Sequence, residues 1–446
     1  MQDKSRAQSA VLLSLSLPII IENLLRQLVG TVNVYIVGSY SDAAAAAVGV
    51  SNQIITLVLN VCTLTAVGAA SAISQFLGAG ERHKASRLST VVFSLFLLIG
   101  LAISAVLALF AKPILQMMNL DSSLLPLGIP YLQLAGGAVF LQITIAALSA
   151  IARSYGNTKS AMTATIIMNG LNLIGSWLVV FRPIEIPLHG VAGVGTVQVI
   201  SELAAAVFMT LYVFRKMDVG IKFRYLKEPL GEDLKVIFRY GVPSAMESLS
   251  YNIAQLLSTS FIASLGAAAV SARVYLLNIV NFSFMIGLSI GQGVQILTGR
   301  YIGAKDYEAV EKLHRRAYVL MVASNLLVSL LFALLRYPLL GIFTKSEEII
   351  AMAAPILFLD MVVQTGRAVE YVSLYSLRGA GDVNFTMKFS VASAFIINIG
   401  IGYLCSVILH MGLTGIWIGF AADEWMRAIF FMRHWASGKW KQKSVV

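Results

Sequence analysis

Two stretches of the chain decide its fold, and they lie 225 residues apart: PIIIENLLRQL at residues 18–28 and PSAMESLSYNI at residues 243–253. Each contains a proline and, four residues later, a glutamate (Glu22 and Glu247) inside an otherwise apolar segment. A charge inside a bilayer is costly, and where one persists it usually faces the interior of a helix bundle or a wet cavity. The two stretches therefore indicate two equivalent membrane helices that turn a charge inward.

The repeat extends over both halves of the chain. The same offset pairs Arg153 with Arg378 and holds without gaps from the first apolar segment to the sixth. Chance explains matched glycines in such a composition far more easily than matched proline, glutamate and arginine. Six crossings is an even number, so both copies enter the membrane in the same sense, related by a pseudo-twofold axis along the membrane normal. We predict two lobes, 1–225 and 226–446, of six helices each.

The composition is that of an all-α polytopic membrane protein. Of 446 residues, 58% are hydrophobic and only 12% are charged, whereas a soluble chain has about 25% charged residues. Apolar runs of about 20 residues or more, long enough to cross a bilayer as helices, recur along the whole chain. The 12 predicted transmembrane helices are 10–38, 46–77, 88–111, 126–151, 160–181, 190–213, 241–263, 270–298, 317–335, 349–376, 389–409 and 413–432.

The positive charges predict the orientation. Most of the 33 Lys and Arg residues lie in alternate connections, and such residues collect on the cytoplasmic side, so we expect both termini in the cytoplasm. The net charge of +11 then reflects a basic face next to anionic lipid. Because no soluble module carries these charges, we expect no nucleic-acid partner. Cys62 and Cys405 lie in apolar spans and indicate neither a disulfide framework nor a metal site.

Pro18 and Pro243 are the candidate hinges. A proline inside a helix removes a backbone hydrogen bond to the preceding turn, and the helix can bend there. Both prolines fall early in their predicted spans. The sequence leaves a harmless kink open as the alternative.

The glutamates of the first and seventh helices differ in their neighbours. Arg26 lies four residues after Glu22, on the same helical face, so the two can neutralise each other as a structural ion pair. At the equivalent place in the second copy stands Tyr251, which leaves Glu247 without such a partner. An unpaired acid in the membrane makes Glu247 the sharper candidate for a functional residue.

A second polar helix is predicted from LFLDMVVQTGRAVEYVSLYSLRGAGD, residues 357–382. Asp360, Arg367 and Glu370 fall roughly on one face of this helix. They are candidates for a coupling or substrate site, and an internally neutral acid–base–acid strip is the alternative. Four other polar residues are expected near the cytoplasmic ends of their helices, where pairing or snorkelling accounts for them: Glu202, Asp423, Glu424 and Arg427.

Several motifs accompany the repeated six-helix units: the opening LPIIIENLLRQLVGTVNVYIVG, the cytoplasmic FLGAGERHKASR and YIGAKDYEAVEK, and SLRGAGD before the eleventh span. In these features the chain resembles the MATE (multidrug and toxic compound extrusion) family. The resemblance implies a cation-coupled exporter in which two lobes flank a central cavity. It also implies alternating access between outward-open and inward-open states.

The chain departs from the family at the polar positions that the resemblance highlights. Where many members have an aspartate on the first helix, this chain has Asn33. Where sodium-coupled members have acids on the seventh and tenth helices, it has Tyr251 and Arg367. An arginine there could replace the cation permanently, as a built-in counter-ion. We therefore predict that Glu247 and Arg367 lie close together and control coupling.

The leading hypothesis is a secondary active antiporter, coupled to H+ or Na+, that exports amphipathic and often cationic compounds. With these departures, proton coupling through Glu22, Glu247 or Glu370 is one interpretation, and a site of some other design is the alternative. A flippase for a lipid-linked precursor is the alternative, kept open by Arg26 and Arg367. The five scattered histidines give no enzyme signature, and we expect no metal and no cofactor beyond the coupling ion. The other expectations are a monomer, contact with membrane lipid, and a bacterial inner (plasma) membrane location.

Overall fold

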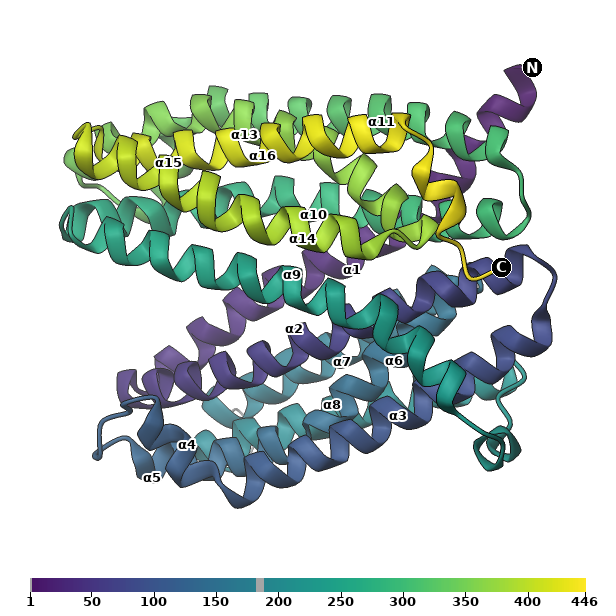
Figure 1. The fold of residues 1–446 in the computed structure, drawn as a ribbon. Helices are drawn as coiled ribbons and strands as arrows, with labels where there is room; N and C mark the ends of the chain where they lie inside the picture. Colours follow the sequence, from purple (N-terminus) through teal and green to yellow (C-terminus); the bar gives the residue numbers. More distant parts are fainter. Residues whose placement is uncertain (1, 182–187) are drawn as a thin grey trace. The chain divides into compact units, whose positions relative to one another are not determined.

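The computed structural model describes residues 2–181 and 188–446, with the side chains of residues 2–7, 31, 34, 35, 38, 40 and 42 left aside. Within these ranges the regular structure is helical and contains no strand (Figure 1). The first half consists of α1 (Gln2–Tyr40), α2 (Asp42–Gly78), α3 (Arg82–Leu109), α4 (Ala111–Met117), α5 (Leu125–Tyr131), η1 (Leu132–Gly136), α6 (Val139–Ser154), α7 (Thr158–Phe181) and α8 (Gly190–Arg215).

The second half repeats this order after the short η2 (Phe223–Lys227). Segments η1 and η3 are π-helical turns that interrupt longer helical stretches, and η4 is a π-helical turn that ends one, before α16 begins at Gly412. The elements of the second half are α9 (Gly231–Ala263), α10 (Ala267–Gly303), α11 (Tyr307–Leu334), α12 (Arg336–Phe343), α13 (Glu347–Ala380), α14 (Val383–Ser393), η3 (Ala394–Ile399), α15 (Gly400–Tyr403), η4 (Leu404–Ile408), α16 (Gly412–Ala436) and η5 (Lys439–Gln442).

The long helices have the dimensions of membrane spans. In the described part of the chain, 10 helical stretches are long and apolar enough to cross a membrane, counting Leu125–Ser154 and Val383–Ile408 as one stretch each. Two further long helices, α9 and α16, carry several charges. Together these stretches overlap the predicted spans one for one. Helices suit this environment because they satisfy their own backbone polar groups in lipid. The predicted all-α polytopic class is confirmed.

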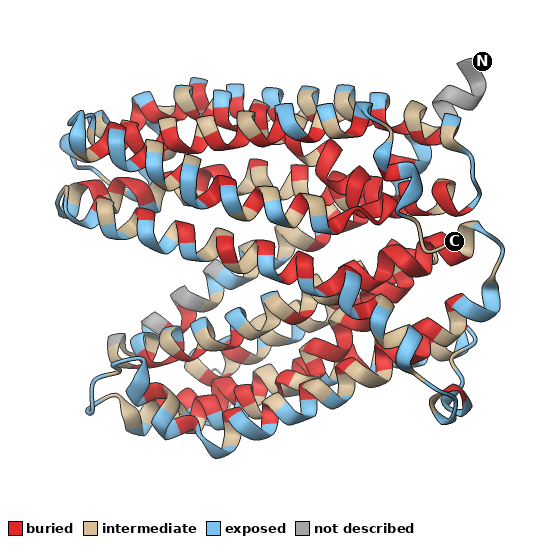
Figure 2. Ribbon diagram, viewed as in Figure 1, coloured by how far each residue is buried: buried red, intermediate tan, exposed pale blue. Residues whose placement is uncertain are grey.

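The outward faces of the helices remain apolar. Buried residues concentrate where helices meet, and exposed residues lie on the outer faces (Figure 2). Among the exposed side chains are Leu98, Leu327 and Ile396, with 65%, 69% and 68% of their surface accessible. Extended apolar surface of this kind marks contact with lipid or a partner. Together with the span lengths, it identifies a membrane-spanning protein.

The chain forms two compact units, each built from its own helices. The N-unit comprises Ile21–Ile73 and Glu81–Gly241, and in it α8 packs against α6 and α7. The C-unit comprises the chain up to Ile20, Ser74–Gly80 and Val242–Val446. In the C-unit α13 is central and packs against α10, α11 and α16. The predicted lobe limits, 225 and 226, stay a prediction.

The two predicted hinges lie where the chain passes from one unit to the other. Pro18 precedes the passage at Ile20–Ile21, and Pro243 follows the passage at Gly241–Val242. Both prolines lie inside continuous helices, α1 and α9. A bend at either position would fall at a unit boundary, but the hinge role itself stays a prediction.

Two glycines matched by the repeat allow a close helix crossing in the C-unit. A Cβ atom on Gly78 would lie 2.0 Å from the carbonyl oxygen of Arg300, and one on Gly303 would lie 1.9 Å from that of Gln75. Arg300 is 225 residues after Gln75, as Gly303 is after Gly78. The two contacts therefore join positions that the 225-residue offset makes equivalent. The parallel arrangement of the two repeats stays a prediction.

Candidate functional site

The two glutamates that define the repeat form equivalent ion pairs. In the N-unit, Arg153 Nη2 at the end of α6 donates to Glu22 Oε2 on α1 at 2.6 Å. In the C-unit, Arg378 Nη2 at the end of α13 donates to Glu247 Oε2 on α9, also at 2.6 Å. Both glutamates are buried. Such short, charge-assisted bonds are the strong class of hydrogen bond. The expectation that Glu247 is unpaired is wrong, because its partner comes from another helix.

The second oxygen of each glutamate also has a partner. Arg26 Nη2 lies 3.3 Å from Glu22 Oε1, so the predicted pair within α1 is present. The equivalent oxygen of Glu247, Oε1, accepts a hydrogen bond of 2.8 Å from Ser390 Oγ. Tyr251, which stands in the place of Arg26, binds Gln255 through its hydroxyl instead. Both glutamates are therefore held at both oxygens, which is typical of fixed structural anions.

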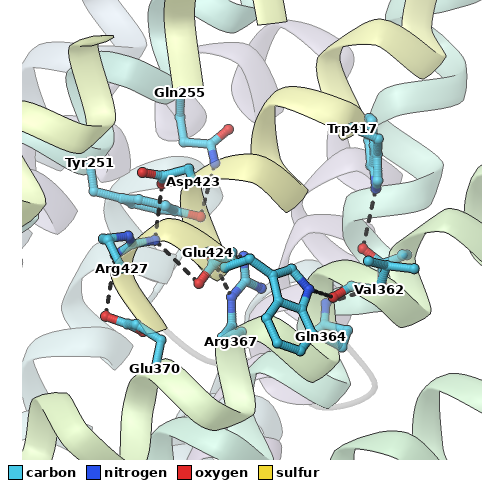
Figure 3. Close-up of polar contacts among 12 residues, drawn as sticks. Tyr251, Gln255, Val362, Gln364, Arg367, Glu370, Trp417, Asp423, Glu424 and Arg427 are labelled. Carbon is cyan, nitrogen blue, oxygen red and sulfur yellow. Dashed lines mark hydrogen bonds and ion pairs between the residues drawn. The ribbon is translucent and has the colours of Figure 1, made fainter. Parts of the chain in front are cut away.

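A denser group of charges lies between α13 and α16 of the C-unit. This group, the C-unit charge cluster, consists of Arg367 and Glu370 on α13 and Asp423, Glu424 and Arg427 on α16 (Figure 3). Arg367 donates to Glu424 Oε1 from Nε at 2.9 Å and from Nη2 at 2.7 Å. Arg427 Nη2 lies 3.0 Å from Asp423 and 3.2 Å from Glu424. The two guanidinium groups thus share the acids of α16.

Glu370 is the least strongly held acid of the cluster. Its Oε1 accepts from Arg427 Nη1 at 3.4 Å, the longest contact in the group. Its Oε2 is buried and has no hydrogen-bond partner. When all five side chains are ionised, three carboxylates face two guanidinium groups, so the cluster carries one net negative charge. A buried uncompensated charge is expensive. A single proton on Glu370 Oε2 would make the cluster neutral.

The predicted pair of Glu247 and Arg367 is wrong. Arg367 turns toward α16 and binds Glu424, whereas Glu247 binds Arg378 and Ser390. Both residues were assigned to the correct helices. Which neighbouring helix each one faces depends on the packing of the C-unit, and the spacing of residues along one helix does not reveal it.

Asp360 on α13 is hydrogen-bonded by neutral side chains. It accepts hydrogen bonds from Gln364 Nε2 at 3.1 Å and from Trp417 Nε1 at 3.2 Å, both neutral donors. The acid–base–acid strip predicted for α13 is therefore not a self-neutralising unit, because Arg367 and Glu370 pair with α16. Gln364 and Trp417 fix the Asp360 carboxylate in place and contribute no charge.

Asn33 faces another amide in the N-unit. Its Nδ2 donates to Asn172 Oδ1 on α7. An amide neither gains nor loses a proton in the physiological range. Asn33 and Asn172 therefore form a neutral hydrogen-bonded pair. The suggested role of Asn33 in the substrate cavity stays a prediction.

A family model described as MatE matches the chain twice, at residues 18–178 and 243–404. The two matches begin at the two prolines and cover more than half of the chain. The chain belongs to the MATE family. Proteins of this family are transporters rather than enzymes, and they span the membrane.

Relatives of this MATE protein match along nearly their whole length. The "Uncharacterized transporter YisQ" of Bacillus subtilis is 38% identical over 434 residues, which are 97% of this chain and 95% of the relative. The "Probable multidrug resistance protein NorM" of Thermotoga maritima is 27% identical over 436 residues, with shares of 98% and 94%. These matches give no support to the flippase alternative.

The fold is also shared with solved MATE structures. One is described as the outward-facing conformation of a multidrug resistance MATE family transporter of the MOP superfamily. It superposes with a TM-score of 0.90 at 21% identity, and the match covers 97% of this chain and 96% of that chain. At this identity the likeness concerns the fold alone. The charge cluster is described from this chain's own residues.

Three charged residues of the second MATE repeat do not all lie where their sequence predicts. Asp423, Glu424 and Arg427 were expected near the cytoplasmic end of their helix. Asp423 instead lies eleven residues after the start of α16, Gly412, and thirteen before its end, Ala436. All three side chains are buried. Counting from the ends of the predicted span would have placed Asp423 and Glu424 near its middle, where a charge needs a partner.

Proposed function

We propose that the protein is a proton-coupled secondary antiporter of the cell membrane that exports amphipathic, often cationic compounds by alternating access. The substrate class rests on relatives whose names describe multidrug resistance. These names also make a small-molecule substrate the expected partner. The proposal includes no catalytic residue and no cofactor beyond the coupling ion. It keeps both termini in the cytoplasm and treats the protein as a monomer in a bacterial inner membrane.

The single observation that carries proton coupling is the charge balance of the C-unit charge cluster. Three acids and two arginines leave one negative charge. Two buried carboxylate oxygens of the cluster have no hydrogen-bond partner, Glu370 Oε2 and Glu424 Oε2, but Glu424 Oε2 lies 3.2 Å from Arg427 Nη2. A metal cation would need several oxygen ligands at once. Here guanidinium groups already contact both oxygens of Glu424 and Oδ2 of Asp423 at 2.7–3.2 Å, and Asp423 Oδ1 accepts from Ser393. A proton needs one free oxygen only, so the geometry favours H+ over Na+.

The same charge balance accounts for antiport. Either a proton or a positively charged substrate would bring the cluster to neutrality. Because each relieves the same buried charge, binding of one weakens binding of the other, and this coupling is reciprocal. Arg367 and Arg427 neutralise two of the three carboxylates, which leaves one negative charge to be balanced. The expected exchange is therefore one proton at this cluster for one singly charged substrate cation.

Transport in proteoliposomes tests this function. Vesicles with an imposed pH gradient, or with an imposed sodium gradient at equal pH, are supplied with a panel of cationic dyes. The pH gradient should drive uptake, and Glu370→Gln should abolish that uptake. Glu348→Gln, an exposed acid on the first turn of the same helix, is the matched control and should transport normally. Uptake driven by sodium alone, or unaffected by Glu370→Gln, would contradict the proposal.

A further inference from the structure

Glu202 is a buried acid in the middle of a membrane helix of the N-unit. It lies twelve residues after Gly190 and thirteen before Arg215, the ends of α8, and only 2% of its surface is exposed. The expectation that it lies near a cytoplasmic end is therefore wrong. An ionisable group at this depth is costly unless it is paired or protonated.

The partners of Glu202 are neutral. Gln142 Nε2 on α6 and Gln198 Nε2 on α8 both donate to Glu202 Oε1, at 2.6 and 2.9 Å. The other oxygen, Oε2, is buried and has no hydrogen-bond partner. The carboxyl group thus has one fully bonded oxygen and one unused oxygen. This asymmetry suits a protonated acid, whose carbonyl oxygen accepts hydrogen bonds while its other oxygen carries the hydrogen.

A second layer of polar groups holds the two amides in place. The Tyr131 hydroxyl on α5 donates to Gln198 Oε1 at 2.6 Å and lies 3.0 Å from Asn52 Oδ1 on α2. Because Gln198 Oε1 receives this hydrogen bond, its Nε2 must face Glu202. The orientation of the donors is therefore built into the fold of the N-unit, which makes this a constructed polar site around one acid.

No permanent cation balances Glu202 in the described residues. The elements packed against α8 are α5, η1, α6 and α7. The ionisable groups that they contribute are Tyr131, Arg153 and Lys159, and α8 itself adds Tyr212 and Arg215 near its end. Arg153 is bound to Glu22 at 2.6 Å, and no described Lys, Arg or His nitrogen lies within the 4.0 Å ion-pair distance of the Glu202 carboxylate. Tyr131 reaches the acid only through Gln198.

The repeat shows what the N-unit lacks. The position 225 residues after Glu202 is Arg427, and the position 225 after Gln142 is Arg367. At these places the C-unit has two fixed cations facing its acids, whereas the N-unit has one acid and one amide. The C-unit therefore neutralises most of its buried charge internally. In the N-unit, the positive charge that balances the Glu202 carboxylate must come from solution.

We propose that Glu202 is a second proton-binding site, which takes up a proton on Oε2 when it is enclosed and releases it when water reaches it. A proton fits because it requires no ligand shell and leaves both amide hydrogen bonds to Oε1 intact. The ionised form would be an isolated charge in mid-membrane. The proposal deepens the proposed antiport, on which its role in coupling rests, but proton binding at Glu202 is measurable without transport.

Infrared difference spectroscopy of the purified protein in lipid nanodiscs, titrated with pH, tests proton binding directly. The wild type should show a carboxylic-acid carbonyl band that disappears at alkaline pH, and this band should be absent in Glu202→Gln. The band should persist in Glu370→Gln, which separates the two sites. Identical acid bands in wild type and Glu202→Gln at every pH would overturn the proposal.

A second variant keeps the test decisive if Glu202→Gln does not fold. Gln142→Leu removes a donor that stabilises the anion more than the acid, so the band should persist to a pH about one to two units higher. Gln116→Leu, at an exposed position, is the control and should leave the titration unchanged. An unmoved titration in Gln142→Leu would also overturn the proposal. Failure of a pH gradient to drive transport, with the Glu202 band present, would instead remove only the proposed antiport.

Discussion

Glu22 forms ion pairs with two arginines, and the contributions of these two pairs to stability can be compared. Arg153 lies 2.6 Å from Glu22 with side-chain exposures of 12% and 5%, whereas Arg26 lies 3.3 Å away with 49% of its side chain exposed. Removing one partner of a buried ion pair typically costs ~3–5 kcal/mol, because the other charge stays buried. An exposed pair contributes about 0–1 kcal/mol. Arg153→Met should therefore destabilise the protein by ~3–5 kcal/mol, and Arg26→Met by less than about 1 kcal/mol.

The assay is the free energy of unfolding in mixed micelles, followed by circular dichroism as a denaturing detergent is added. The double variant Arg153→Met with Glu22→Gln should regain most of the loss, since no buried charge is then left uncompensated. Equal losses for Arg26→Met and Arg153→Met would refute the argument. A double variant no more stable than Arg153→Met would refute it as well, because the cost would then come from packing.

Three further predictions concern packing and neutral polar groups. Gly303→Val should prevent folding or destabilise the protein by more than about 3 kcal/mol, since a Cβ would lie 1.9 Å from the Gln75 carbonyl oxygen. Gly400→Val, where nothing lies within 4 Å, is the control. Equal expression of the two variants would contradict this prediction. Asn33→Ala should leave the pH profile of transport unshifted, because an amide does not titrate; a shifted profile would be the contrary result. Asp360→Asn should keep the bond from Trp417 to its oxygen, and its new Nδ2 can donate to the unpartnered Gln364 Oε1 if that amide turns, so the cost should be less than about 1.5 kcal/mol. Unfolding measures this cost, and a larger loss would show that the charge matters.

The pattern of membrane spans was predictable because each span depends only on residues that are close together in the sequence. Apolar runs of membrane length follow from composition alone, and the 225-residue offset follows from matched residues such as Glu22 and Glu247. The contact of Glu22 with Arg26 was predictable for the same reason, since residues four apart share a helical face.

The decisive ion pairs were not predictable in this way. Arg153 and Glu22 are 131 residues apart, as are Arg378 and Glu247. Only the packing of helices brings them together, so reasoning along one helix left Glu247 unpaired. The repeat did contain a usable signal, because it matched both members of each pair at the same offset.

The charges of α16 were missed for a different reason. The sequence predicts them at a helix end, where pairing or snorkelling reduces the cost of a charge in the membrane. Asp423 lies in mid-helix instead. A mid-membrane position would have required a partner on a neighbouring helix, and Arg367 and Glu370 on α13 were already candidates. Among the five residues that form the cluster, the acids exceed the arginines by one.

The most direct test of the central claim is a count of protons released when a cationic substrate binds. Purified protein in lightly buffered detergent solution is mixed with a transported dye, and the pH change is recorded for wild type, Glu370→Gln and Glu348→Gln. If the C-unit charge cluster exchanges a proton for a cation, wild type and Glu348→Gln should release about one proton per bound dye from this cluster, and Glu370→Gln should lose that release. Proton release that is absent from the wild type, or equal in Glu370→Gln, would contradict the account.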